Sequence, residues 1–111
     1  MGEVIMESLF LGRKEFKQIY LNPNYFIDQD GNVYSQFAKK IIKHSYRKRG
    51  NKTYPYICIY FNGKQRKYAI HRLVYHTWVQ PLREGEQVNH KDDNELNCNY
   101  KNLYVGTQKD N

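Results

Sequence analysis

The side chains best suited to chemistry lie in the last quarter of the chain, around Asn89 and His90. His90 is followed 12 residues later by Asn102, which comes directly before the apolar triplet Leu103–Tyr104–Val105. An imidazole has a pKa near neutrality, so a histidine can take a proton from water without strong perturbation of that pKa. Such a group serves hydrolysis only if the surrounding elements hold its ring beside a substrate.

Four elements are predicted to position these side chains. Gln87–His90 and Leu103–Val105 are predicted as strands, and Lys91–Lys101 as a long polar loop whose asparagines and aspartates cap their own backbone. The segment Thr107–Asp110 fits a capping box, with an aspartate in place of the usual Glu or Gln, so Asn111 would lie on the first turn of a final helix. The predicted order is therefore strand, loop, strand, helix.

The first half of the chain predicts short strands. Residues 1–13 are compatible with a short helix or a frayed leader, and residues 16–43 with short strands. Asp28–Asn32 is a turn signal in which Gly31 can take a positive φ. The segment Tyr46–Tyr54 contains basic residues, glycine and asparagine, and it is predicted as a loop.

The middle of the chain predicts a hairpin followed by a helix. The run Tyr54–Phe61 alternates between two faces, Asn62–Gly63 is a strong two-residue turn signal, and Lys64–Ile70 is the return strand. From His71 to Val79 the apolar spacing changes to that of a short helix, which stops before Pro81.

The cysteines and the apolar runs exclude some classes of protein. Cys58 and Cys98 do not form a CxxC pair, so a zinc ribbon is unsupported. Cys58 lies in a strand-like run and is predicted to be a buried small hydrophobe, whereas Cys98 lies in a polar loop. No signal peptide and no run of transmembrane length is visible, so we expect no membrane partner.

Positive charge is concentrated in one stretch of a chain whose formal charge is +7. No aspartate or glutamate occurs between Gly31 and Arg83. A surface this one-sided repels itself unless a polyanion relieves it, and nucleic acid is the obvious candidate. A solvated basic face is the alternative. The predicted phosphate contacts are Lys39, Lys40, Lys43, Arg47, Lys48, Arg49, Lys52, Lys64, Arg66, Lys67 and Arg72.

These features together resemble a known family. Residues 71–111 resemble the HNH domain of phage and intron homing endonucleases, and residues 15–35 resemble the small NUMOD4-like module that often precedes it. The resemblance is carried by His71-Arg72-Leu73-Val74, Val88-Asn89-His90-Lys91-Asp92, Asn97, Asn99, Asn102-Leu103 and Asn111.

The resemblance implies a role for each matching residue. His90 would be the general base, and Asn102 a structural residue that pins the loop so that His90 points at the phosphate. Asn89 and Asn111 would bind one divalent ion, Mg²⁺ or Mn²⁺, that polarises the phosphate and stabilises the leaving 3′-oxygen. Both predicted ligands are asparagines, although hard cations prefer at least one carboxylate, so a DNA phosphate could supply the missing negative charge.

Four neighbouring residues have a less defined role in this interpretation. His71 is expected to pack or to hydrogen-bond rather than to catalyse, and Arg72 either grips a phosphate or is solvated. Asp92 matches a family aspartate that shapes the loop, and Asp93 stands where glycine is common.

The sequence thus predicts an α+β fold: a small antiparallel basic β-sheet with one helix, followed by a ββα-metal motif whose final helix is cut short at Asn111. The expected segments are a leader (1–14), a basic DNA-binding module (15–70) and the HNH nuclease domain (71–111). Helix nucleation is costly, so a single turn at the end must be held by packing or it frays.

The predicted activity is a metal-dependent endonuclease that nicks or cuts duplex DNA in the cytoplasm of a bacterial or phage-infected cell, without an obligate protein partner. One alternative is a DNA-binding module that keeps the fold but cleaves weakly or not at all. Another is an RNA-binding protein that uses exposed members of its 11 tyrosines for stacking.

Overall fold

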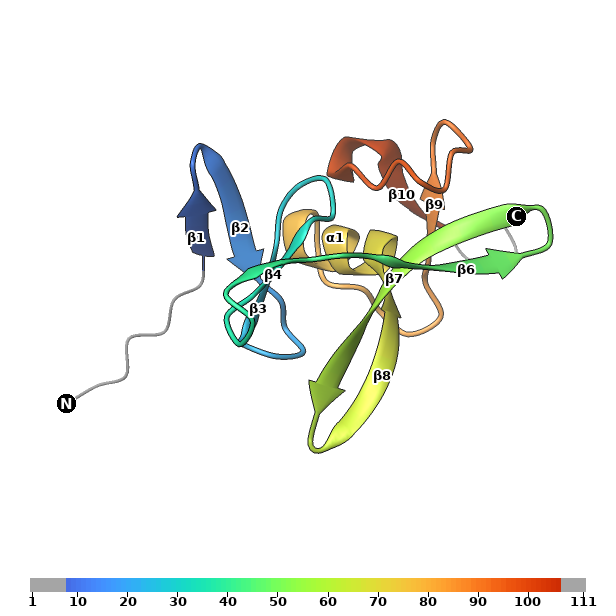
Figure 1. Cartoon of the computed structure of the whole chain (residues 1–111). Coiled ribbons are helices and arrows are strands. Elements are labelled where there is room, and N and C mark those ends of the chain that lie inside the picture. Colours follow the sequence, from blue (N-terminus) through green and yellow to red (C-terminus); the bar gives the residue numbers. More distant parts are fainter. Residues whose placement is uncertain (1–7, 107–111) are drawn as a thin grey trace.

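The computed structural model describes residues 8–106 and folds them into three antiparallel sheets around one helix, α1 (Ile70–Trp78) (Figure 1). The first sheet has the strand order β1-β2-β3-β4-β5, which is β1 (Ser8–Leu11), β2 (Lys14–Gln18), β3 (Tyr25–Ile27), β4 (Val33–Ser35) and β5 (Lys40–Ile42). The second is β6 (Ser45–Arg49), β7 (Lys52–Phe61) and β8 (Lys64–Ala69). The third pairs β9 (Gln87–His90) with β10 (Leu103–Gly106), which follows the 3₁₀ helix η1 (Tyr100–Asn102). The predicted α+β class with antiparallel sheets and one helix is confirmed.

The first described residues form a strand, not the helix or frayed leader that their composition allowed. Ser8–Leu11 pairs with Lys14–Gln18 in a tight hairpin. The chain reverses at Gly12, whose φ of 64° lies in the left-handed region that glycine adopts without a steric cost. The short strands predicted within residues 16–43 are confirmed by β2 to β5.

The segment Tyr46–Tyr54 was predicted as a loop, and that prediction was wrong. It forms β6 and the start of β7, which pair from Ser45↔Tyr56 to Arg49↔Lys52. Every residue of β6 is exposed, so the strand has no apolar alternation by which it could be recognised. Charged side chains are typical of such an edge strand because they discourage pairing with another chain.

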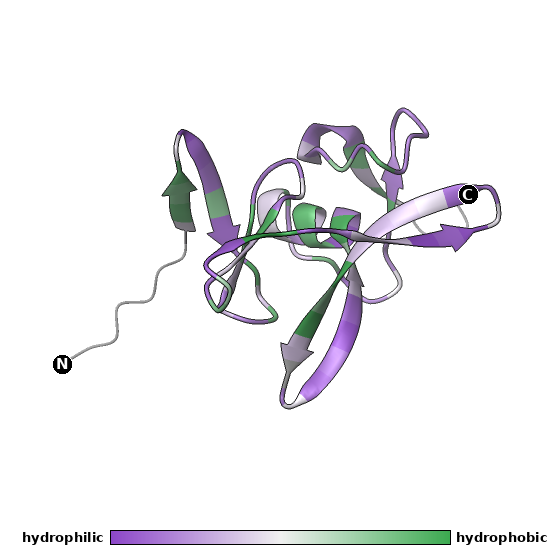
Figure 2. Ribbon diagram, viewed as in Figure 1, coloured by the Kyte–Doolittle hydropathy of each residue, from purple (hydrophilic) through white to green (hydrophobic). Residues whose placement is uncertain are grey.

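The core lies around α1 and draws residues from all three sheets. Ile70 and Val74 of α1 are fully buried, together with Ile27 of β3 and Ile59 of β7. The indole Nε1 of Trp78 donates to the carbonyl oxygen of Ile27 at 3.0 Å, which ties the end of α1 to the first sheet. Apolar residues of α1 face this centre, whereas β6 and β8 are hydrophilic along most of their length (Figure 2). The segments expected as a basic module and a nuclease domain therefore share one core.

Two small residues lie at a close contact between the first sheet and α1. A Cβ placed on Gly31 would lie 2.5 Å from Cγ2 of Ile70, and the φ of Gly31 is +96°. The predicted positive φ at this turn is confirmed. Cys98 packs here with 3% of its surface exposed, whereas Cys58, which was predicted to be buried, is half-buried. Burial raises the pKa of the Cys98 thiol to about 12.

Within residues 8–106, no helix has the length and apolar content needed to cross a lipid bilayer.

Candidate active site

The antiparallel pair β9–β10 positions Asn89 and His90. His90 is opposite Leu103 and Asn89 is opposite Tyr104. Directly after His90, the backbone amide of Lys91 donates to the carbonyl oxygen of Asn102 at 2.7 Å, so the loop leaves β9 and re-enters β10 at the same level. His90 and Asn102, which are 12 positions apart in the sequence, are thereby brought together at the same end of one short ladder.

The loop between these strands is built from side chains that cap neighbouring backbone amides, as predicted. Asp92 accepts from the amide of Asn94, Asn94 from that of Leu96, and Asn99 from that of Lys101, at 2.8–3.1 Å. These local bonds replace a regular ladder, so a polar loop keeps a defined shape without a core of its own.

Asn102 and Asp92 hold the two ends of the loop together. Asn102 Nδ2 donates to Asp92 Oδ1 and to the carbonyl oxygen of Asn97, both at 2.9 Å, while Asn102 Oδ1 accepts from the amide of Asp92 at 3.2 Å. Asp92 Oδ2 accepts from Asn97 Nδ2 at 2.9 Å. Hydrogen bonds from Asn97, from the amide of Asn94 and from Asn102 lower the pKa of Asp92 to about 2. This carboxylate is therefore ionised and engaged in structural bonds at neutral pH.

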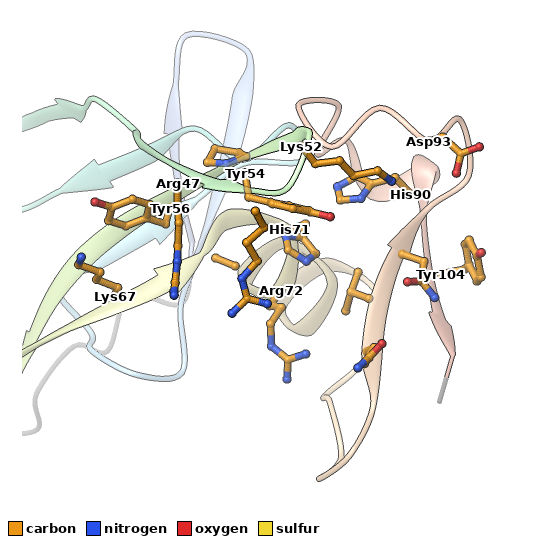
Figure 3. A pocket seen from close by; sticks show the side chains of 16 residues that line it. Arg47, Lys52, Tyr54, Tyr56, Lys67, His71, Arg72, His90, Asp93 and Tyr104 are labelled. Carbon is orange, nitrogen blue, oxygen red and sulfur yellow. The ribbon is translucent and has the colours of Figure 1, made fainter. Parts of the chain in front are cut away.

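A pocket of about 520 Å³ opens beside His90, between the β6–β7–β8 sheet, the start of α1 and the β9–β10 pair (Figure 3). The side chains that line it are mainly basic, aromatic or amide-bearing. They include Arg47, Arg49, Lys52, Tyr54, Tyr56, Lys67, His71, Arg72, Asn89, His90, Asp93 and Tyr104. A pocket of this composition suits an anionic group that must lie beside an imidazole.

His90 lies in a cluster of three rings. Its ring centroid is 4.9 Å from that of His71 and 6.3 Å from that of Tyr54. Burial lowers the pKa of His90, while the carboxylates of Asp92 and Glu95 act in the opposite direction and raise it. The net direction is downward, so His90 is neutral at neutral pH and its free ring nitrogen can accept a proton.

His71 lies beside His90 in the site, and the sequence did not predict this proximity. It was expected to pack or to hydrogen-bond, and it does pack, but against His90 at the pocket wall. Its burial, with smaller contributions from His90 and Arg72, lowers its pKa to about 3. Tyr54 was likewise seen only as part of a strand. No spacing rule could have found either residue, because they reach His90 from α1 and β7.

The structure divides the eleven predicted phosphate contacts into five that line the pocket and six that do not. Arg47, Arg49, Lys52 and Lys67 lie on one face of the β6–β7–β8 sheet and line the pocket, as does Arg72 at the start of α1. The remaining predicted contacts lie outside the pocket lining: Lys39, Lys40, Lys43, Lys48, Lys64 and Arg66. Arg72 is exposed, and its Nη1 donates to the carbonyl oxygen of Glu86 at 3.0 Å.

Glu95 connects the loop to the basic sheet. Its Oε1 accepts from the backbone amide of Thr53 at 2.9 Å, and this bond is the main cause of its lowered pKa. Thr53 follows Lys52, which lines the pocket. The bond therefore joins the loop that follows His90 to β7, which carries basic residues of the pocket.

The predicted ion ligands are only partly described. Asn89 lines the pocket, and within residues 8–106 its Nδ2 is buried without a hydrogen-bond partner. A hard cation would be held by its Oδ1 and not by this nitrogen. Asn111 and the predicted final helix lie outside the described residues. Among the described residues, no group of three or more His, Cys, Asp or Glu side chains is arranged to hold a metal.

Comparisons with known proteins all find similarity to HNH endonucleases. Residues 68–111 match the family model described as HNH endonuclease. The chain is 36% identical over 99 residues to the H-N-H endonuclease F-TflII of Escherichia phage T5, covering 87% of this chain and 50% of that protein. It is 36% identical over 88 residues to the DNA endonuclease I-HmuI of Bacillus phage SP01, covering 79% of this chain and 49% of that protein.

A solved structure also matches. This structure shows DNA binding and cleavage by the HNH homing endonuclease I-HmuI. It superimposes on the present chain with a TM-score of 0.74 at 35% identity. The match covers 85% of this chain and 53% of that one. The chain thus spans about half the length of these relatives.

Proposed function

We propose that this chain is an HNH endonuclease that hydrolyses phosphodiester bonds of duplex DNA with His90 as the general base. The match of residues 68–111 to the family model and the similarity to phage HNH endonucleases support this proposal. The observation that carries the proposal is the pocket itself, in which a histidine with a lowered pKa lies among basic side chains. A phosphate that enters the pocket meets an unprotonated imidazole.

His90 begins the reaction by taking a proton from a water molecule beside the phosphate. The oxygen of that water attacks phosphorus, the bond from phosphorus to the 3′-oxygen breaks, and the 3′-oxygen takes a proton from a solvent water to become a hydroxyl. His90 then releases its proton to solvent, which restores the free base. The other product is a 5′-phosphate. A positioned general base of this kind contributes roughly 10²–10⁴-fold to a hydrolytic rate.

Asn102 supports His90 indirectly in this proposal. Its three bonds to Asp92 and Asn97 fix the loop that follows His90, and the backbone bond from Lys91 to Asn102 fixes the end of β9. Asn102 is therefore a positioning residue. Its loss would displace the imidazole without removing it.

A divalent ion, Mg²⁺ or Mn²⁺, fits the site through amide oxygens. Asn89 would hold it from β9 and Asn111 from beyond the described residues, with phosphate oxygens supplying negative charge. When bound, such an ion polarises the scissile phosphate and stabilises the leaving 3′-oxygen. The neutral ligand set predicts weak binding of the ion without DNA.

The basic residues of the pocket face would hold the DNA backbone. Contacts to phosphate fix the register of a protein on DNA without reading its sequence, so loose sequence preference is expected from this surface. A duplex DNA substrate also supports a site of action in the cytoplasm of a bacterial or phage-infected cell.

A plasmid-nicking assay tests this proposal. Supercoiled plasmid is incubated with Mg²⁺, with Mn²⁺ or with chelator, and wild type is compared with His90→Ala. We expect cleavage by wild type only with metal, and loss of cleavage in His90→Ala with unchanged DNA affinity. His44→Gln is the matched control, because His44 lies outside the pocket and bonds the carbonyl oxygen of Gly31, which an amide can also do. Binding without cleavage by wild type would show a DNA-binding module instead.

A further inference from the structure

His71 and His90 meet in the pocket wall although they lie on different elements. His71 is the second residue of α1, and His90 is the last residue of β9. Their ring centroids are 4.9 Å apart with an angle of 46° between the planes, and Tyr54 covers both rings at 5.8 and 6.3 Å (Figure 3). Three separate segments of the chain thus enclose one pair of imidazoles.

Each imidazole buries one nitrogen that has no hydrogen-bond partner among the described residues. These atoms are His71 Nδ1 and His90 Nε2. An unpaired buried polar atom destabilises the fold, so a hydrogen bond between these two atoms would satisfy both at once. A neutral imidazole has one N–H donor and one acceptor nitrogen, so either ring can complement the other.

The burial of His71 and the position of His90 at the pocket indicate which ring accepts the hydrogen bond. Burial is the largest cause that lowers the pKa of His71, and it brings that pKa to about 3. His71 therefore stays neutral across the pH range in which a nuclease works, and it keeps an acceptor nitrogen throughout. His90 lines the pocket, and the proposed role as general base requires that one of its ring nitrogens carries no proton.

We propose that His71 is a positioning residue whose Nδ1 accepts a hydrogen bond from Nε2–H of His90. This bond fixes His90 in the tautomer whose Nδ1 is unprotonated and available to water. The inference rests on the proposed function and adds the group that orients the base.

The bond also suits the proton transfer itself. When Nδ1 of His90 takes the proton from water, the ring becomes a cation and its Nε2–H becomes a stronger donor, so the bond to His71 strengthens as the reaction proceeds. Oriented bases are commonly held by a third group in this way. A neutral orienting group has one advantage here, since a carboxylate at the same place would repel the DNA phosphate.

Substitutions of His71 separate the acceptor from the packing. His71→Phe keeps a ring of similar size and removes the acceptor. His71→Asn loses ring packing but retains an amide oxygen near the position of Nδ1. The tautomer of His90 is read from the ¹⁵N chemical shifts of its imidazole in chelator, and single-turnover cleavage of duplex DNA is measured in parallel with affinity.

We expect wild-type His90 to populate the Nε2–H tautomer, and His71→Phe to shift it toward a mixture. Cleavage should fall roughly 10–100-fold in His71→Phe, as for other groups that orient a reactive ligand, while affinity for DNA stays within about twofold. His71→Asn should restore most of the rate and the tautomer.

The inference is overturned if His90 in the wild type carries its proton on Nδ1, or if His71→Phe leaves both tautomer and rate unchanged. The wild-type spectrum decides the first point even if His71→Phe does not fold. If the wild type does not cleave DNA at all, the proposed function fails, whereas the tautomer measurement still tests the hydrogen bond between the two histidines.

Discussion

His90 has a pKa that is set by burial more than by its neighbouring carboxylates, and this gives the reaction a defined pH dependence. A general base must be unprotonated, so the rate falls when the pH drops below the pKa of the base. Because that pKa is lowered, we expect the acid limb of the single-turnover rate to have its midpoint below 6.5. Measuring the rate from neutral to acidic pH under subsaturating conditions, where the profile reports the pKa of the free enzyme, checks this. A midpoint at or above that value would contradict it.

Asp93 brings a negative charge to a pocket that is otherwise basic. It has a φ of 58° and lines the pocket near His90, at a position where glycine was expected from the family resemblance. Asp93→Asn removes the charge and keeps a side chain that tolerates this backbone conformation. We expect it to tighten DNA binding severalfold at low salt and less at high salt, because added salt screens the repulsion.

Fluorescence anisotropy with a labelled duplex in chelator measures this effect. Glu84→Gln removes one negative charge from an exposed residue outside the pocket lining, and it serves as the control. Equal affinities for Asp93→Asn and Glu84→Gln would show that Asp93 does not face the phosphate.

At the scale of elements, the turn between β3 and β4 packs closely on α1 at Gly31. Its φ of +96° and the 2.5 Å distance from an added Cβ to Ile70 Cγ2 leave no room for a side chain. We expect Gly31→Ala to lower the free energy of unfolding by about 2–4 kcal/mol, through backbone strain and overpacking together. Urea unfolding followed by tryptophan fluorescence measures the change, since Trp78, the single tryptophan, joins the end of α1 to β3.

Gly50→Ala separates the two causes. Gly50 also has a positive φ, but nothing lies within 4 Å of an added Cβ there. Its substitution should cost only the strain of the left-handed conformation, roughly 1–2 kcal/mol. A similar loss of stability in both variants would show that the contact with Ile70 adds nothing.

At the scale of elements, the sequence predicted what periodicity or turn chemistry encodes. The hairpin at Asn62–Gly63, α1 and the strands β9 and β10 follow from such local signals, and all were confirmed. The strand β6 was missed because its residues are all exposed, so only pairing with β7 defines it. Pairing between segments is a property of the fold, which no window along the sequence contains.

Across the whole molecule, the predicted phosphate contacts divide between the pocket and surfaces outside it, and this arrangement predicts unequal effects of equal charge changes. Arg47 and Lys67 line the pocket, whereas Lys48 and Arg66 lie on the same two strands outside the pocket lining. We expect the double variant Arg47→Gln/Lys67→Gln to weaken duplex binding roughly tenfold or more and to reduce the salt slope by about 2.

The double variant Lys48→Gln/Arg66→Gln removes the same charge from the same strands. It should bind nearly as the wild type does when both are measured by anisotropy over a series of salt concentrations. If the two double variants lose affinity equally, the net charge of the molecule governs binding, and the pocket face has no special role.

The sequence by itself determined the local chemistry of this protein. His90 and Asn102 lie within one strand–loop–strand unit, so short-range hydrogen bonds fix their relative position. The run without acidic residues indicates a polyanionic partner. Only the tertiary structure decided that His71 and Tyr54 enclose His90. It also decided that four predicted phosphate contacts of the β6–β7–β8 sheet and Arg72 of α1 lie at the pocket. The physical reason is burial: α1 must cover its apolar face with strands from distant parts of the chain, and that packing carries the second histidine to the first.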